Sequence, residues 1–152
     1  MAGDKSHTGW SGGDPDDFTS MTLIRTSLAM RRVFVATLAP FDLPPHHFSV
    51  LMHLVEQPGL SQADLARVVL ATPQSVGELL RVMEHKGLVE RTAPAGRGLP
   101  SAVYASKAGR DILDAVTPHV KAAFAPEALG LDEATYRRLN VDLHAVLEAL
   151  GP

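Results

Sequence analysis

The chain has 152 residues, 45% hydrophobic and 20% charged, which predicts one soluble globular unit with a full core. It has no cysteine, which excludes disulfides, thiolate metal sites and cysteine-based redox sensing, and its net charge of −3 argues weakly against a nucleic-acid partner. It has neither a signal-peptide core nor a run of about 18 apolar residues, so we expect a cytoplasmic protein.

The N-terminal part predicts a tail followed by a long helix. Residues 1–18 are rich in Gly, Asp and Ser, a composition typical of disorder. The first helix is predicted from Thr19 to Leu38, because Pro40 ends it. Its apolar residues form a narrow seam, interrupted by Arg31, that consists of Met21, Ile24, Leu28, Val35 and Leu38.

Three helix starts follow in close succession. Pro44 and Pro45 open a second helix, which Pro58 and Gly59 stop. Ser61 is a good N-cap for a third helix. Thr72, followed by a proline, caps a fourth helix. Two short amphipathic helices joined by a tight turn predict a helix-turn-helix, whose second helix enters the DNA major groove.

The remaining elements are a hairpin and two helices. Residues 88–91 and 102–104 are predicted strands around the loop APAGRGLPS, so a β-wing follows the helix-turn-helix. Ser106 caps a fifth helix, in which Pro118 is expected to cause a kink or a break. Asp132 caps the last helix, whose apolar seam is Leu139, Leu143, Val146 and Leu150.

The distribution of charge differs from its total. Residues 81–110 contain six of the fourteen basic residues but only two of the seventeen acidic ones. Distant acidic residues are screened within about 10 Å at 0.1 M salt, so local charge decides contact with a DNA backbone. The window therefore favours DNA binding, although an ordinary solvated surface remains an alternative.

Three motifs in this order resemble the MarR family of bacterial winged-helix regulators. They are SQADLARVV, LLRVMEHKGLVER and SKAG, and the resemblance extends over roughly residues 20–150. It implies a mainly α fold with a small β-wing: a winged helix-turn-helix domain plus N- and C-terminal dimerisation helices. It further implies a transcriptional regulator, with repression the expected mode, that needs no cofactor. The family often has Asp-x-Arg in the wing, whereas this chain has Ala95, Gly96 and Arg97, so the bracing aspartate is missing.

The resemblance implies that double-stranded DNA is contacted by the start of the third helix, by the fourth helix and by the wing. In the fourth helix a Gln side chain suits adenine, and Arg97 at the wing tip suits a narrow minor groove. Gly77 either lets the backbone approach DNA or allows tight packing against a neighbouring helix. The predicted contacts are Ser61, Gln62, Thr72, Pro73, Gln74, Ser75, Gly77, Arg81, Arg91, Arg97, Gly98 and Lys107.

The terminal helices predict a homodimer, because a heptad-like seam at each chain end suits a two-fold interface. The alternative is that they pack on each other within one protomer. We therefore expect one continuous domain with three parts and an inverted-repeat, palindromic operator. The parts are a tail at 1–18, dimerisation helices at 19–42 and 107–152, and a DNA-binding lobe at 43–106.

The resemblance also implies a small lipophilic or phenolic effector that releases DNA. Residues near the expected cleft are Arg31, Phe34, Phe41, His46 and His47. A histidine-based metal sensor of the same fold is an alternative, but adjacent His46 and His47 point about 100° apart on a helix. No metal site and no enzymatic motif is predicted. A winged helix used only for protein contact is the remaining alternative.

Overall fold

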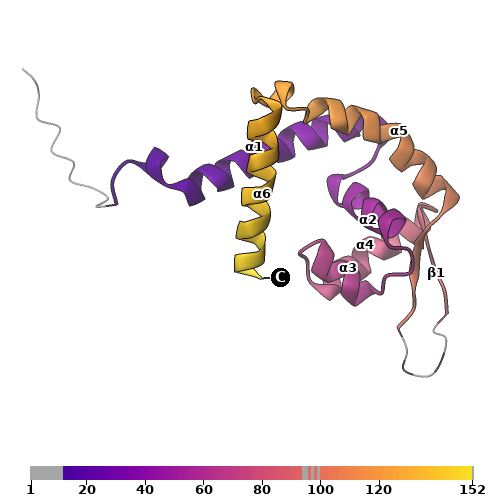
Figure 1. The fold of residues 1–152 in the computed structure, drawn as a ribbon. Coiled ribbons are helices and arrows are strands. Elements are labelled where there is room, and N and C mark those ends of the chain that lie inside the picture. The colour runs from indigo at the N-terminus through magenta and orange to yellow at the C-terminus, as the bar shows by residue number, and fades with distance from the viewer. Residues whose placement is uncertain (1–11, 94–95, 97, 99, 152) are drawn as a thin grey trace, which may run out of the picture. The chain divides into compact units, whose positions relative to one another are not determined.

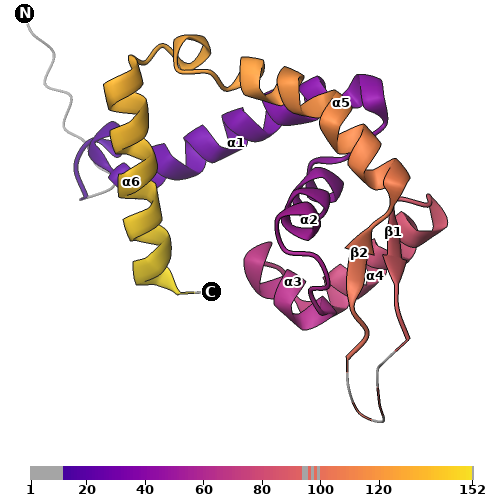
Figure 2. The same cartoon turned by 45° about the vertical axis from the view of Figure 1, so that its right-hand side comes forward.

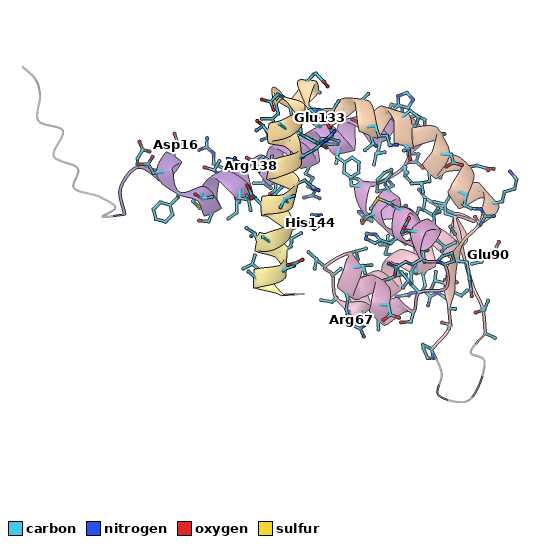
Figure 3. The ribbon with its side chains drawn as sticks, in the orientation of Figure 1. Asp16, Arg67, Glu90, Glu133, Arg138 and His144 are labelled. Carbon is cyan, nitrogen blue, oxygen red and sulfur yellow. The ribbon has the colours of Figure 1, made fainter. Side chains whose placement is uncertain are left out.

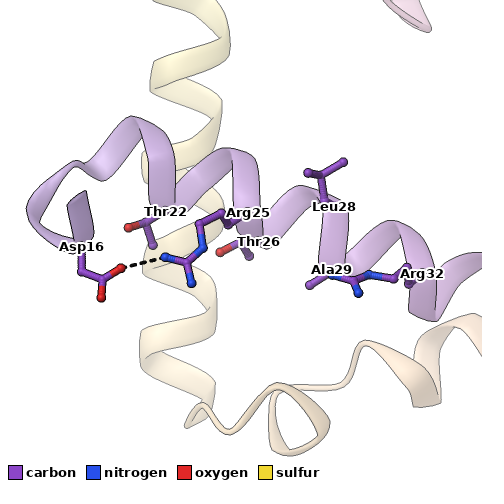
Figure 4. A pocket seen from close by; sticks show the side chains of 7 residues that line it. All are labelled: Asp16, Thr22, Arg25, Thr26, Leu28, Ala29 and Arg32. Carbon is purple, nitrogen blue, oxygen red and sulfur yellow. Dashed lines mark hydrogen bonds and ion pairs between the residues drawn. The ribbon is translucent and has the colours of Figure 1, made fainter. Parts of the chain in front are cut away.

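The computed structural model describes residues 12–93, 96, 98 and 100–151, and the chain forms two compact units, Met1–Val33 and Phe34–Pro152. In the first unit the short 3-10 helix η1 (Pro15–Asp17) precedes α1 (Thr19–Leu38), which continues into the second unit. Asp16 Oδ1 accepts a hydrogen bond of 2.7 Å from Arg25 Nη1 beside a shallow pocket of about 590 Å³ on α1 (Figure 4). Residues 1–11 of the predicted tail lie outside the described residues.

The second unit contains the remaining elements, which Figures 1 and 2 show from two sides. After α1 they follow in the order η2 (Ala39–Phe41), α2 (Pro45–Glu56), α3 (Gln62–Val68), α4 (Pro73–His85), β1 (Val89–Arg91), β2 (Val103–Ala105), α5 (Lys107–Ala123), η3 (Glu127–Leu129) and α6 (Glu133–Leu150). The predicted fold class, mainly α with a small β-wing, is confirmed.

The helices begin where their capping residues predict. Ser61 Oγ accepts from the N–H of Asp64 at 3.1 Å, and the Asp64 carboxylate accepts from the N–H of Ser61 at 3.4 Å, which completes a capping box on α3. Thr72 Oγ1 accepts from an N–H of the first turn of α4 at 3.1 Å. Ser106 and Asp132 likewise cap α5 and α6. Local hydrogen bonding therefore fixes the start of each of these helices.

The wing is a two-stranded antiparallel sheet in which Val89 pairs with Ala105 and Arg91 with Val103. The first predicted strand, 88–91, begins one residue before β1 and ends with it. The second, 102–104, begins and ends one residue before β2. Leu88 already accepts a hydrogen bond from the N–H of Ser106 at the sheet's edge. The sheet thus leads directly into the cap of α5.

One hydrophobic core joins α2, α3, α4, the sheet and α5. Its fully buried large side chains are Leu38, Val50, Leu51, Leu54, Leu65, Val76, Leu80, Met83, Val103 and Val116. Side chains that recur every three or four residues on α4 enter this core, so the opposite side of α4 is left to solvent.

Two features of the helices differ from simple expectation. Pro118 does not break α5, which continues past it to Ala123. In α1 the only buried seam residue is Leu38, and Ile24 and Leu28 are 52% and 53% exposed. No residue of α6 is buried. The apolar side chains of both terminal helices are therefore left for another surface to cover.

Candidate nucleic-acid interface

The helix α4 presents a polar face to solvent. Its buried side consists of Val76, Leu80 and Met83. The predicted contact residues Gln74, Ser75 and Arg81 are all exposed. Gln and Ser side chains can pair with base edges, and an Arg can reach a base or a phosphate, so this face has the chemistry of a DNA-reading helix.

The start of α4 is also open. Thr72 and Pro73 are exposed, and the hydroxyl oxygens of Thr72 and Ser75 lie 2.8 Å apart in a hydrogen bond. The first-turn N–H groups of a helix lack helical acceptors and carry partial positive charge. Because Pro73 has no N–H and the Ser75 N–H is bonded to Thr72 Oγ1, the N–H of Gln74 is the first-turn donor suited to a phosphate oxygen at this end of α4.

The start of α3 is more enclosed. Ser61 is half-buried, and its hydroxyl donates to Asp64 Oδ2 at 2.6 Å. Hydrogen bonds from the Ser61 hydroxyl and then from its N–H hold the pKa of the Asp64 carboxyl below its ordinary value. Asp64 also accepts a 2.7 Å bond from Arg67, which lies on the outer side of α3 (Figure 3). Much of the polar capacity of Ser61 thus serves the helix cap.

Gln62, Gly77 and Arg91 lie together where α3, α4 and β1 meet. Gln62 Nε2 donates to the carbonyl oxygen of Pro73 at 2.7 Å, and Arg91 Nη1 donates to Gln62 Oε1 at 3.3 Å. A Cβ atom at Gly77 would lie 2.6 Å from Gln62 Nε2. The structure therefore supports packing between helices as the reason for glycine at position 77.

Two guanidinium groups border a depression of about 300 Å³ at this junction. It is lined by Gln62, Gln74, Gly77, Arg81 and Arg91. Arg81 Nε donates to the carbonyl oxygen of Gly77 at 3.4 Å, a long bond that holds the guanidinium near the depression. The Arg81 guanidinium, the Arg91 guanidinium, whose charge Glu84 partly offsets from 3.1 Å, and the amide side chains can all donate to an anionic oxygen such as that of a phosphate.

Three predicted contacts lie elsewhere. Lys107 begins α5, at the end of the sheet opposite the wing loop, and forms an exposed 2.7 Å ion pair with Asp111. Gly98 is exposed in the loop with φ of +83°, and Arg97 lies outside the described residues. The structure thus brings the α3, α4 and β1 residues together and leaves Lys107 apart from them.

Sequence reasoning missed three residues on the same face of α4. Glu78, Val82 and His85 are exposed, and Val82 is 50% exposed although it is apolar. They fall at helical spacing from Gln74 and Arg81, so the period of α4 could have found them. A Glu can accept from cytosine and an apolar group can contact a thymine methyl, so both types belong to the chemistry of base reading.

The predicted effector residues separate into three groups. The ring of Phe34 packs against Phe48 and Phe124 with centroids 5.2 and 5.6 Å away, and Phe41 packs against His119 at 5.1 Å. These two phenylalanines therefore serve packing within the second unit. Arg31 lies on α1 in the first unit and is exposed.

His46 and His47 line a groove of about 760 Å³ between the start of α2 and α4. His47 is only 3% exposed, and its Nδ1 has no hydrogen-bond partner. Burial, and then the charges of His46 and Lys86, lower the pKa of His47 from 6.5 to about 4. This ring is therefore neutral at physiological pH.

Within the described ranges, no cluster of three or more His, Cys, Asp or Glu side chains is placed to hold a metal ion. Over the same part of the chain, no helix is long and apolar enough to cross a membrane.

The comparisons with known proteins agree with this geometry. The sequence model of the MarR family matches residues 41–98. The HTH-type transcriptional repressor Rv2887 of Mycobacterium tuberculosis is 37% identical over 131 residues, which are 85% of this chain and 90% of that protein.

Solved structures show the same fold. Rv2887 in complex with salicylic acid matches with a TM-score of 0.67 and 29% identity over 86% of this chain and 96% of that one. The repressor CouR bound to a 23-mer DNA duplex matches with a TM-score of 0.73 and 24% identity over 94% of this chain and 99% of that one. The latter likeness shows the fold alone. The motifs, the winged helix-turn-helix and the similarity to Rv2887 together show that the chain belongs to the MarR family of transcriptional regulators.

Proposed function

We propose that this regulator binds double-stranded DNA as a homodimer on an inverted-repeat operator and represses transcription. The observation that carries the proposal is the exposed polar face of α4, with Gln74, Ser75 and Arg81 opposite a buried apolar side. A helix of this kind, at the second position of a helix-turn-helix, is suited to the major groove.

The wing contributes contacts to the backbone and the minor groove. Arg91, at the end of β1, and Arg81, on α4, border one depression and suit phosphate oxygens. Arg97 in the wing loop remains our candidate for the minor groove. Arg97→Ala is expected to weaken operator binding by about 1–3 kcal/mol with little change in the melting temperature.

The dimer is formed by the terminal helices. The proposed dimerisation parts, 19–42 and 107–152, flank the DNA-binding lobe at 43–106. Apart from Leu38, the α1 seam is exposed in the single chain, and α6 carries exposed Leu139, Val146 and Leu150 between polar residues such as Glu133, Arg138 and His144 (Figure 3). Exposed apolar surface of this extent is typical of a protein interface.

A small aromatic acid is the proposed effector, since Rv2887 has been solved with salicylic acid and with p-aminosalicylic acid. A ligand that binds the DNA-free conformation more tightly shifts the population toward it and lowers operator affinity. Added salicylate is therefore expected to release the protein from DNA. No shift in affinity at millimolar salicylate would exclude this compound as the effector.

The proposed function is tested by measuring DNA binding over a series of salt concentrations. A duplex selected from a random pool is labelled, and its anisotropy is followed as protein is added. Neutralised phosphates release counterions, so the affinity is expected to fall steeply as salt rises. Absence of salt-dependent binding would favour a protein-interaction module instead.

A further inference from the structure

The side chain of Gln62 connects three elements of the lobe. Gln62 is the first residue of α3, and its carboxamide donates to the carbonyl oxygen of Pro73, the first residue of α4, at 2.7 Å. The same carboxamide accepts from Arg91 Nη1, on β1, at 3.3 Å. Both ends of this amide are therefore engaged within the protein.

Arg91 is held from a second side. Its Nε lies 3.1 Å from Glu84 Oε2 on α4, an ion pair whose N–H is not aligned for a hydrogen bond. Arg91 is also the last residue of β1, where the chain leaves the sheet for the wing loop. The guanidinium group is thus bracketed between Gln62 of α3 and Glu84 of α4 at the root of the wing.

The packing at Gly77 depends on the same amide. The three atoms nearest to a Cβ built at Gly77 all belong to Gln62, with Nε2 at 2.6 Å, Cδ at 3.2 Å and Oε1 at 3.3 Å. Any larger residue at 77 would displace the amide from its position against α4. Gln62 and Gly77 therefore form a matched pair.

We propose that Gln62 is a positioning residue for DNA binding, which holds the Arg91 guanidinium beside the exposed face of α4. The inference rests on the proposed function and changes the role expected for Gln62, whose carboxamide serves Arg91 and α4 in place of DNA. A long Arg side chain loses rotamer freedom when it binds a phosphate, and a side chain held in advance loses less. The wing root and α4 then meet the DNA backbone in one fixed arrangement.

The first experiment is a double-mutant cycle on operator affinity. Gln62→Ala is expected to weaken binding about tenfold, and Arg91→Ala somewhat more. If Gln62 acts through Arg91, the double variant binds DNA no more weakly than Arg91→Ala alone. Both single variants are then expected to show a smaller dependence of operator affinity on salt than the wild type. Losses that multiply in the double variant would overturn the proposal. Gln57→Ala, at an exposed glutamine after α2, is the matched control and is expected to bind like the wild type.

The second experiment measures thermal melting and needs no DNA. Gly77→Ala is expected to change the melting temperature little in the wild-type background, because displacement of the Gln62 amide offsets the helix-favouring effect of Ala. In the Gln62→Ala background the same change is expected to raise it, because the obstructing atoms are gone and Ala favours a helix over Gly. Equal effects in the two backgrounds would contradict the matched pair.

The two experiments separate the possible failures. A wild-type protein that binds no DNA overturns the proposed function, and the positioning role with it, whatever the melting temperatures show. A wild-type protein that binds DNA, together with additive cycles, overturns the positioning role alone.

Discussion

Leu70 lies in the turn between α3 and α4 and has a backbone φ of +53°. Its side chain is 62% exposed. A residue with a Cβ pays about 1–2 kcal/mol for this left-handed conformation, and glycine pays almost nothing. Leu70→Gly is therefore expected to be more stable than Leu70→Ala by about 1 kcal/mol, or about 2–4 °C in melting temperature.

The alanine variant is the control, because it removes the same exposed side chain and keeps the backbone strain. Melting of both variants by circular dichroism checks the prediction. A glycine variant less stable than the alanine variant would show that position 70 pays little for its φ angle.

His47 predicts a pH dependence of stability. The buried ring has its pKa lowered to about 4, whereas in the unfolded chain it takes a proton near pH 6.5. The unfolded state thus binds more protons between these values, so stability is full above pH 6.5 and declines down to about pH 4. His47→Gln is expected to remove this decline, which is on the order of 3 kcal/mol.

Urea unfolding at several pH values measures the effect as a difference between wild type and variant. His46→Gln is the matched control, because His46 is the exposed neighbour and its loss should leave most of the decline in place. A His47→Gln variant with the wild-type pH profile would mean that His47 titrates normally in the folded protein.

At the scale of elements, helix starts were predictable because their causes are local. Ser61, Thr72, Ser106 and Asp132 cap the helices that the sequence assigns to them. The glycine of the SKAG motif has a cause that is not local. A Cβ at Gly109 would collide with the carbonyl oxygen of Leu88, the residue before β1. The backbone of α5 therefore lies too close to this segment for any side chain at position 109. Only the folded chain shows this contact.

The candidate interface was predictable to the same extent. Helical period places Gln74 and Arg81 on the exposed side of α4, and the same rule could have found Glu78. The link from Gln62 to Arg91 joins residues 29 positions apart and has no sequence signal. Tertiary packing brings these two side chains together. The sequence pattern therefore predicted a DNA contact for Gln62 and gave no sign of its hydrogen bond to Arg91.

Pro118 gives a prediction about α5. It is exposed and lies inside a continuous helix. Because proline has no N–H, it cannot donate the usual helical hydrogen bond to the carbonyl four residues earlier. Pro118→Ala is expected to restore that hydrogen bond and raise the free energy of unfolding by about 1–2 kcal/mol. Urea unfolding checks this, with Pro126→Ala, just outside α5, as the control. A loss of stability would show that α5 depends on the proline.

At the scale of the whole molecule, the single chain leaves much apolar surface uncovered. Ile24 and Leu28 lie on the α1 seam, and Val141 on α6 is 65% exposed. A second copy of the chain is the proposed cover, which would make the dimer inseparable from the function. Two lobes in fixed relation are what an inverted repeat requires.

Leu28→Glu is expected to shift the protein from dimer to monomer and to weaken operator binding more than a hundredfold, because one lobe alone makes half of the contacts. Sedimentation equilibrium measures the mass of each variant. Thr26→Glu, at an exposed position about 160° around α1 from Leu28, is the control and should remain dimeric. A Leu28→Glu protein that stays dimeric would place the interface elsewhere.

The most direct test is selection of DNA from a random pool by the wild-type protein and by Gln74→Ala in parallel. We expect the wild type to enrich an inverted repeat with half-sites about one helical turn, or ~34 Å, apart, and Gln74→Ala to alter the base preference inside each half-site. An unenriched pool, a single unrepeated site, or an identical motif from both proteins would contradict the claim that α4 reads DNA in duplicate.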